Sequence, residues 1–329
     1  MATRLAKFEF QQGFHRETTA YAEGQRWFDG NYVRFRAGRP ENMRGYETRA
    51  SGATFDGSAR DLLTWSDSDS KKRAIFGTPD KLYVNEGDVI YDITPITTAV
   101  TLANVFGTSS GSTRVCCSDA AHGRAVGDYV LFTSSAAFNA VSLQGNTYQV
   151  VSVESANVFT ISVTDAANAT GSDAGSATFN YYIPTGNSIA AAGLGYGAAR
   201  YQATVCASQT RAWNQPASAG SSGIVFDITQ WSLDNWGEDV VANRKGSNIF
   251  YFDSDASVLP TRATSVTTSP INSNSIIVSP NDRHLVCLGT NEFAVDATVS
   301  GTFNPMLVRW SDQDDRSNWV PSVSSTAGE

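Results

Sequence analysis

The chain is built almost entirely from short, strand-like runs separated by residues that favour turns. The runs are rich in Val, Ile, Thr, Tyr and Phe, and each is bounded by Gly, Asp, Asn or Ser, which is the pattern of β-strands. The clearest examples are 82–84, 89–93, 148–153, 158–163 and 249–252. No window of about 12 residues carries the sustained apolar stripe, bracketed by caps, that marks an amphipathic helix. The sequence therefore predicts an all-β fold.

The composition favours a packed protein whose surface is largely covered by other subunits. Hydrophobic residues make up 41% of the 329 positions and aromatic residues 11%, enough to fill a sizeable core. Charged residues reach only 17%, below the roughly 25% of ordinary soluble domains. The basic residues are mainly Arg, whose planar fork suits interfacial ion pairs better than the Lys ammonium does. The length is that of about two domains.

Strand patterns and turn residues divide the chain into four zones. An N-terminal arm or first β-unit precedes a four-strand meander of the size of one propeller blade. A charge-poor segment with its own strands follows, and blade-like runs then return, with Pro95 and Pro184 as hinges at the two junctions. The predicted zones are 1–50 for the arm, 51–95 for the blade, 96–183 for the insert and 184–329 for further blades. We expect a β-propeller-type domain interrupted by an inserted small β-barrel or sandwich domain.

The strands within these zones can be placed more closely. We expect the meander at 60–65, 73–76, 81–84 and 89–93, and a five-strand set in the insert at 113–117, 119–123, 126–132, 148–153 and 159–163. A Trp-Ser pair recurs at Trp65, Trp231 and Trp310, which suggests radial repetition of the outermost strands. Three blade equivalents are too few for a propeller of about four to eight blades, so we expect the chain to be C-terminally truncated.

The charge is uneven along the chain. The net charge of −8 argues against a protein that grips nucleic acid over its whole surface. Residues 1–50 nevertheless carry nine Lys and Arg against six acids. The candidate site residues within this basic segment are Arg34, Arg36, Arg39 and Arg44.

Strand alternation places Arg34 and Arg36 on one face, with Val33 and Phe35 on the other. Too little acid lies nearby to neutralise these arginines, so inter-subunit salt bridges are the favoured interpretation. Contact with the phosphates of passing DNA and a simple solvated face remain as alternatives. The other zones are acidic and can supply carboxylates from a second copy of the chain.

The sequence contains no pattern of metal ligands. The four cysteines, Cys116, Cys117, Cys206 and Cys287, form no C-x-x-C pair, and we expect free structural thiols in a reducing cytoplasm. Alternation in a strand would bury at most one of Cys116 and Cys117.

Two acidic stretches resemble pieces of a calcium loop. They contain Asp67 and Asp69 in one and Asp312, Asp314 and Asp315 in the other, without the central Gly and the final Glu of an EF-hand. We expect solvated hairpin tips in preference to a metal-supported turn, and neither a structural metal nor a cofactor.

No group of residues in the sequence forms a pattern that favours catalysis over a structural role. The glycines of Gly193–Gly197 resemble a phosphate loop, but they follow no Rossmann strand and lack the Lys-Ser/Thr of a Walker motif. There is no Gly-x-Ser-x-Gly elbow, and His122, before a glycine, is typical of a turn. We expect a protein that is not an enzyme. The N-terminus lacks the apolar core of a signal peptide, and no run reaches the length of a membrane span, so neither is expected.

Four stretches carry a resemblance to a known family. Trp27–Gly45 resembles the opening of tail nozzle proteins of tailed phages, whose usual form is Trp-x-Asp-Gly-x-x-Val-Arg-Phe-Arg-x-Gly-x-Pro-Glu-Lys-x-Gly-Gly-Trp. Here Met43-Arg-Gly-Tyr46 replaces the ending of that pattern. Trp231–Ala242 and Val308–Trp319 match later landmarks in the same order, and Ala121–Val130 is similar to a β-module that such proteins often carry as an insertion.

The resemblance implies a virion structural protein. Members of this family form a ring, usually a hexamer, below the portal and the adaptor (head-to-tail connector), and its channel retains and then releases the genome. The implied partners are other copies of the chain, the adaptor, tail fibre or needle proteins, and passing double-stranded DNA bound without sequence specificity. The implied location is the phage tail, assembled in the host cytoplasm. An acidic channel would let DNA slide, because each attractive contact with a phosphate would retard it.

Two other functions fit an all-β chain of this kind. A receptor-binding or glycan-degrading phage tail protein is the main alternative, because propellers and β-insertions also serve those roles. A bacterial β-propeller binding module is another, and it would behave as a monomer.

Overall fold

The structure is a computed structural model. It describes residues 11–17, 19, 21, 26–43, 45, 53–185, 230–255, 259, 261–293 and 301–329. Every regular element in these ranges is a β-strand, which confirms the all-β class. The chain divides into two compact units, Met1–Ser51 and Gly52–Glu329. Within the described ranges there is no helix long and apolar enough to cross a membrane.

The first sheet of the larger unit is a four-stranded antiparallel meander, as the sequence predicts. Its strands are β3 (Asp61–Ser66), β4 (Lys72–Gly77), β5 (Leu82–Glu86) and β6 (Val89–Asp92). Gly87 and Asp88 join the last two strands with φ of +57° and +69°. Two successive positive φ values are what a two-residue type I′ hairpin requires.

The second substructure is a closed barrel of six antiparallel strands, in the order β10-β11-β8-β7-β12-β9. Its strands are β7 (Val100–Thr108), β8 (Arg114–Ser118), β9 (Tyr129–Ser135), β10 (Thr147–Ser155), β11 (Val158–Ser162) and β12 (Gly171–Tyr181). The expected set of five strands is therefore wrong. Residues 119–123 form a turn, and the sequence pattern misses β7 and β12. Bulges break the alternation of this pair near Asn104, which has φ of +58°, and β12 is rich in Gly, Ser and Ala.

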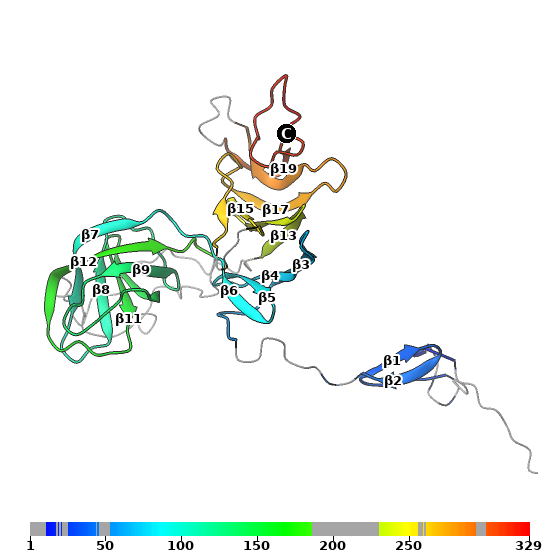
Figure 1. The fold of residues 1–329 in the computed structure, drawn as a ribbon, viewed down its shortest axis with the longest axis horizontal. Coiled ribbons are helices and arrows are strands. Elements are labelled where there is room, and N and C mark those ends of the chain that lie inside the picture. The colour runs from blue at the N-terminus through cyan, green and yellow to red at the C-terminus, as the bar shows by residue number, and fades with distance from the viewer. Residues whose placement is uncertain are drawn as a thin grey trace, which may run out of the picture. The chain divides into compact units, whose positions relative to one another are not determined.

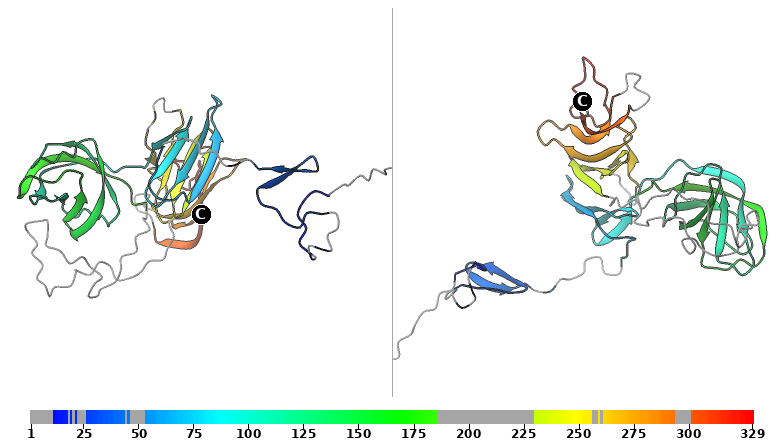
Figure 2. Two further views of the ribbon diagram at one scale, coloured as in Figure 1. Left: turned by 90° about the horizontal axis from the view of Figure 1, so that it is seen from below. Right: turned by 180° about the vertical axis from the view of Figure 1, so that it is seen from behind.

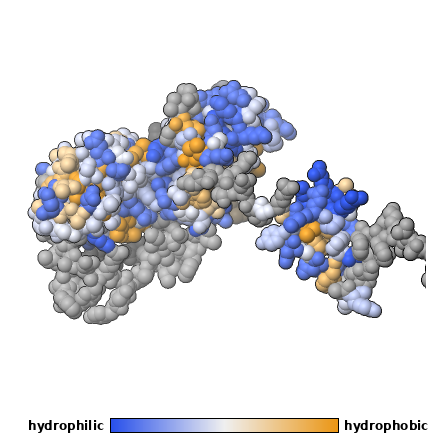
Figure 3. Space-filling view, turned by 60° about the horizontal axis from the view of Figure 1, so that its bottom comes forward, coloured by the Kyte–Doolittle hydropathy of each residue, from blue (hydrophilic) through white to orange (hydrophobic). Residues whose placement is uncertain are grey.

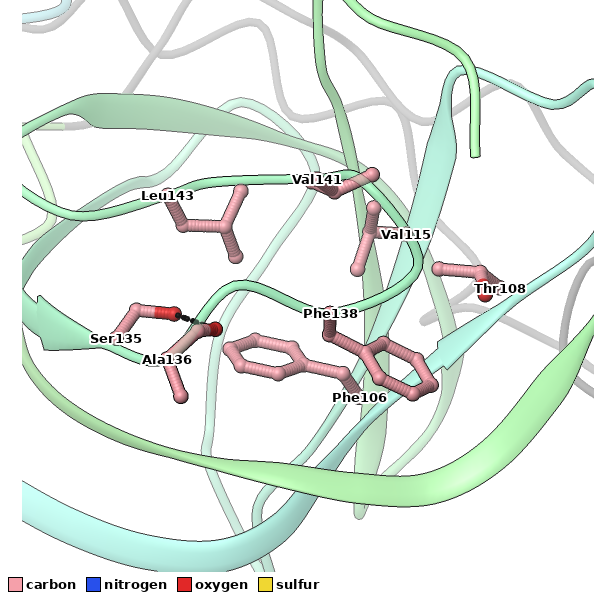
Figure 4. A pocket seen from close by; sticks show the side chains of 8 residues that line it. All are labelled: Phe106, Thr108, Val115, Ser135, Ala136, Phe138, Val141 and Leu143. Atoms are coloured by element: carbon pink, nitrogen blue, oxygen red, sulfur yellow. Dashed lines mark hydrogen bonds between the residues drawn. The ribbon is translucent and has the colours of Figure 1, made fainter. Parts of the chain in front are cut away.

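Aromatic side chains fill the barrel. Phe132 lies 5.9 Å from Phe106 and 5.5 Å from Phe179 between ring centroids. Figure 4 shows the narrow space left at one end, which is too small to admit a water molecule. Its lining residues are Phe106, Thr108, Val115, Ser135, Ala136, Phe138, Val141 and Leu143. The barrel interior is thus a packed core and not a ligand chamber.

Two further antiparallel sheets follow the barrel. The four-stranded one contains β13 (Trp231–Trp236), β14 (Asp239–Arg244), β15 (Ile249–Phe252) and β16 (Thr264–Ser265), and the three-stranded one contains β17 (Ser273–Val278), β18 (Leu285–Asn291) and β19 (Phe303–Trp310). Gly237, with φ of +71°, turns the run 231–242 into the hairpin β13–β14. We refer to β3–β6, β13–β16 and β17–β19 as the first, second and third sheets.

The three sheets pack face to face in chain order, seen as the cyan, yellow and orange layers in Figures 1 and 2. Ile75 and Val84 of the first sheet pack with Phe250 and Phe252 of the second. The second sheet uses its other face, including Val241, against the third. Both faces of the middle sheet are therefore covered.

Two tryptophans tie the first sheet to the second in opposite directions. Trp65 Nε1 donates to the backbone oxygen of Glu238 at 3.0 Å, and Trp231 Nε1 donates to that of Thr78 at 2.8 Å. Trp65 is the last residue but one of β3, Trp231 begins β13, and Trp310 ends β19. The Trp-Ser pairs are not equivalent positions, so their interpretation as a repeat is wrong. A two-residue match cannot fix strand register.

A polar network joins the barrel to the first sheet. The Tyr182 hydroxyl donates to Asp92 at 2.8 Å and accepts from Arg262 at 2.7 Å. The Ile183 amide donates to the Pro95 oxygen at 3.0 Å, so the two chain segments that cross between the substructures are bonded to each other. The segments expected to act as hinges are therefore cross-linked.

Two of the three described cysteines are the free thiols that we expect, and Cys116 is not. Cys117 and Cys287 are free and buried, and burial raises the pKa of both thiols, that of Cys287 to about 12. Cys116 is also buried, and it is disulfide-bonded. Alternation assigns a side chain to a face but does not tell whether that face is covered, and sequence spacing does not show which cysteines meet in space. Cys206 lies outside the described residues.

Candidate functional site: an arginine hairpin

The smaller unit contains the hairpin that carries the predicted site. Strands β1 (Val33–Arg36) and β2 (Arg39–Asn42) are joined by Ala37 and Gly38, with φ of +48° and +77°. Arg34 and Arg36 are exposed, whereas Val33 and Phe35 are half-buried, as strand alternation predicts.

Arg34 has a partner within its own chain. Glu41 lies directly opposite in the antiparallel register, and its carboxylate accepts from Arg34 Nε at 3.2 Å. The expectation that local acid cannot neutralise the cluster is therefore wrong for this residue. The register, which the turn sets, places the one nearby acid across from it. Both side chains are well exposed, so the pair adds little stability.

The end of the hairpin carries the uncompensated charge. Arg36 lies directly opposite Arg39, and both are exposed. In the part of the chain that the structure describes, neither guanidinium has a carboxylate partner. Like charges directly opposite each other disfavour strand pairing, so this pair favours an external anion. Arg44, the fourth predicted residue, lies outside the described residues.

The opposite face of the hairpin is aromatic. The ring of Phe35 lies 5.3 Å from Phe14 and 6.5 Å from Trp27. A Cβ at Gly30 would stand 2.6 Å from the Phe14 ring, so a larger residue there would require that ring to shift. Phe14 remains 42% exposed, and Figure 3 shows this unit as mainly hydrophilic with a small hydrophobic area.

The described part of this unit contains one sheet of two strands. A two-stranded sheet is marginally stable by itself in water, because one hairpin covers too little apolar surface. The described part of the unit adds an isolated bridge, Phe14 to Trp27, and an ion pair of Arg16 with Asp29. The hydrogen bond from Arg16 holds the pKa of Asp29 below its usual value. The hairpin thus presents two faces for another surface, one cationic and one aromatic.

The acidic stretches have their own partners. Asp67 is buried, and it bonds Arg73 at 3.1 Å and the Lys71 amide at 2.8 Å, so its predicted place on a solvated hairpin tip is wrong. Asp69 is exposed beside Lys71. Nothing in the sequence pattern predicts the pair of Asp67 with Arg73, because Arg73 lies on the next strand, β4.

Asp312 closes the C-terminal loop of the third sheet. Its Oδ1 accepts from the amide and hydroxyl of Thr326 and from the Gln313 amide, and its Oδ2 accepts from Asn318. These bonds lower the pKa of Asp312 to about 2. By accepting these hydrogen bonds, the Asp312 carboxylate holds the loop together, and we call it the loop clasp.

This clasp predicts a pH dependence. The folded-state pKa of Asp312 lies below the ordinary value of 3.8, so its contribution to stability is complete above about pH 4. It is lost as the pH falls through about 2. We expect the unfolding temperature to drop over this range by less in Asp312→Asn than in the natural chain, measured by circular dichroism. Equal pH dependence of the two proteins would contradict the clasp.

The barrel histidine is held structurally. The Arg124 amide donates to Nδ1 of His122 at 3.0 Å, which leaves Nε2 to donate to the Ser155 oxygen at 3.1 Å. Both ring nitrogens are therefore occupied, in agreement with the predicted turn role. Nδ1 of His284 lies 2.8 Å from the Ser311 oxygen. Gly193–Gly197 lies outside the described residues.

Comparisons with known proteins identify no relative by sequence. No family model matches the sequence, and no curated protein matches it. Among solved structures, the chain has a likeness to the phage phi92 endosialidase at a TM-score of 0.24 and 16% identity, over 88% of this chain and 39% of that one. The chain therefore spans about two fifths of that protein's length. At this level of likeness, function has to be argued from the residues.

Proposed function

We propose that the chain is a structural protein of a phage tail, of the nozzle type. It forms a ring-shaped channel below the portal and adaptor that retains the genome and conducts it during ejection. The observation that carries this proposal is the stretch Trp27–Gly45, which has the nozzle-like pattern and contains the hairpin β1–β2. In this role the hairpin contacts a neighbouring copy or the adaptor.

The stacked sheets support the same proposal. Three antiparallel sheets that pack face to face in chain order are what an arc of propeller blades would provide. We propose that they belong to a β-propeller-type domain and that the barrel is inserted between its first and second blades. The virion is the corresponding location, and tail fibre or needle proteins are the further partners.

The charge distribution supports passage of DNA without tight binding. The net charge is −8, and acids crowd near the turns of the second sheet. Repulsion from Glu238, Asp239 and Asp253 raises the pKa of Asp255. A channel wall of this sign repels phosphates, so double-stranded DNA slides past it. The exposed Arg36 and Arg39 are the candidate contacts if any part of the chain touches the DNA.

The proposed role is mechanical and electrostatic, with no catalysis by this chain. The hydrogen bonds of His122 and Asp312 described above serve turns and loops. A glycan-degrading tail protein is the competing function. Incubation with host polysaccharide separates the two: release of reducing ends, lost in a single-residue variant, would contradict the structural role.

The hairpin arginines give the direct test of assembly. In Arg36→Ala/Arg39→Ala we expect normal folding but ring formation or adaptor docking weakened by about 30-fold or more, because a desolvated carboxylate of the partner loses its cation. Sedimentation velocity measures the assembly and circular dichroism the fold. Arg34→Ala is the matched control, since Glu41 already satisfies that residue, and it should change assembly little.

Two outcomes would contradict the assembly role of the hairpin. One is a double variant that assembles normally at high salt and supports infectious particles. The other is an equal effect of Arg34→Ala. A double variant that assembles normally but loses salt-dependent DNA retention would move the arginines from the interface to the channel.

A further inference from the structure

Among the described residues, the third sheet has one packed face and one exposed face. One side of the third sheet packs on the second sheet through Ile276, Val278 and Cys287. On the other side, two cross-strand pairs follow the register, Ile277 with Val286 and Leu288 with Val308. Ile277, Leu288 and Val308 are 53%, 42% and 42% exposed.

The described strand residues place no charge on this face. The strands β17, β18 and β19 contain a single charged residue, Arg309, and it is buried. Its guanidinium donates to the backbone oxygens of Asn291 and Trp319. A sheet face that stays in water ordinarily alternates to polar and charged side chains. An exposed, uncharged apolar face across three strands is typical of a surface that binds another protein surface.

The other end of the stack offers a matching surface. On the first sheet, the side turned away from the second sheet carries an uncharged row across all four strands, from Thr64 through Ala74 and Asn85 to Ile90. Phe55 of the same chain packs on Phe76 and Tyr83 beside this row, and the exposed Lys72 lies on its other flank. Leu62, on the same side, is 62% exposed. Each of the two inner contacts already joins one sheet to the next sheet in chain order. A contact of the third sheet with the first sheet of another copy continues that order.

We infer that the exposed face of the third sheet binds the uncharged row of the first sheet in a second copy of this chain. The contact is heterologous, because two different surfaces meet, and repetition of such a contact closes a ring or extends a filament. This inference deepens the proposed function, since it supplies a ring-forming contact. It involves residues distinct from those of the hairpin.

The test uses the full chain and two complementary variants. Leu288→Lys places a charge on the third-sheet face, and Leu62→Lys places one on the first-sheet face. Each should weaken self-association by about 10- to 100-fold, measured by sedimentation equilibrium, because an apolar contact is replaced by a charge that must be desolvated. An equimolar mixture of the two variants retains one intact pair of faces, so it should form a one-to-one dimer that does not grow.

Controls keep folding and assembly apart. Val323→Lys alters an apolar residue that is fully exposed outside both faces and should leave association unchanged. Ile277→Thr keeps a β-branched residue in the strand and should weaken association mildly, which covers the case in which Leu288→Lys fails to fold. The unfolding temperature of each variant shows whether the fold is intact.

Each other result overturns the inference. A natural chain that stays monomeric excludes the contact, and so does an assembly indifferent to Leu288→Lys and Ile277→Thr. Loss of assembly in Leu288→Lys with no effect of Leu62→Lys would show that the third-sheet face binds its own copy. If these variants assemble normally while Arg36→Ala/Arg39→Ala does not, the stacking contact fails and the hairpin interface stands.

Discussion

Replacing Arg73 by Met should destabilise the larger unit by about 3–5 kcal/mol, because the change strands a buried carboxylate. Arg73 is 5% exposed and contacts the carboxylates of Asp67 and Glu86. Its NH1 also donates to the Ser254 oxygen at 2.7 Å, which ties the first sheet to the loop after β15. Urea unfolding at pH 7, followed by tryptophan fluorescence, measures the loss.

The chain provides an exposed ion pair as control. Arg283 and Asp314 lie 3.2 Å apart with both side chains more than half exposed. Arg283→Met should cost no more than about 1 kcal/mol. Removing both members of the buried pair, in Arg73→Met/Asp67→Asn, should recover part of the loss, because the stranded charge is gone. A change of under about 1 kcal/mol in Arg73→Met would show that Asp67 is solvated after all.

Gly77→Ala should be nearly as damaging, at roughly 3 kcal/mol, because it overpacks the contact between the first and second sheets. A Cβ at this position would lie 2.2 Å from two atoms of the Trp231 indole. That ring is buried and its Nε1 is bonded to Thr78, so it cannot move away without losing the bond. Thermal unfolding of the variant reports the cost.

The barrel contains a matched glycine. Gly107 also lies within a strand, and a Cβ there would meet its nearest neighbour at 3.4 Å, an ordinary contact. Gly107→Ala should therefore change stability by less than about 1 kcal/mol. Equal effects of the two substitutions would mean that the indole of Trp231 does not fix the spacing of the sheets.

The first sheet could be predicted from sequence because its information is local. Strand-forming residues in Leu82–Val84 and turn residues such as Gly87 determine both the strands and their connections. Strand β12 could not be predicted, because a Gly- and Ser-rich strand is stabilised by pairing with its two neighbours and lacks a strand-like sequence pattern. The barrel closes only through such pairings between distant strands.

In the candidate site, too, local features could be predicted from the sequence and strand pairing could not. Alternation was sufficient to place Arg34 and Arg36 on one face. The pairing of Arg34 with Glu41 depends on register, as does the approach of Arg36 to Arg39, and both follow from the two-residue turn. The contacts of Arg73 could not be predicted from the sequence, because they come from three separate strands and loops.

The proposed function places this chain in a ring around the path of the genome in a phage tail. Cryo-electron microscopy of intact particles that contain the chain tests it most directly. We expect its barrel and stacked sheets in a ring directly below the portal and adaptor, with the hairpin β1–β2 against a neighbouring subunit or the adaptor. Density for the chain at the tip of a fibre or spike, away from the channel, would contradict the claim.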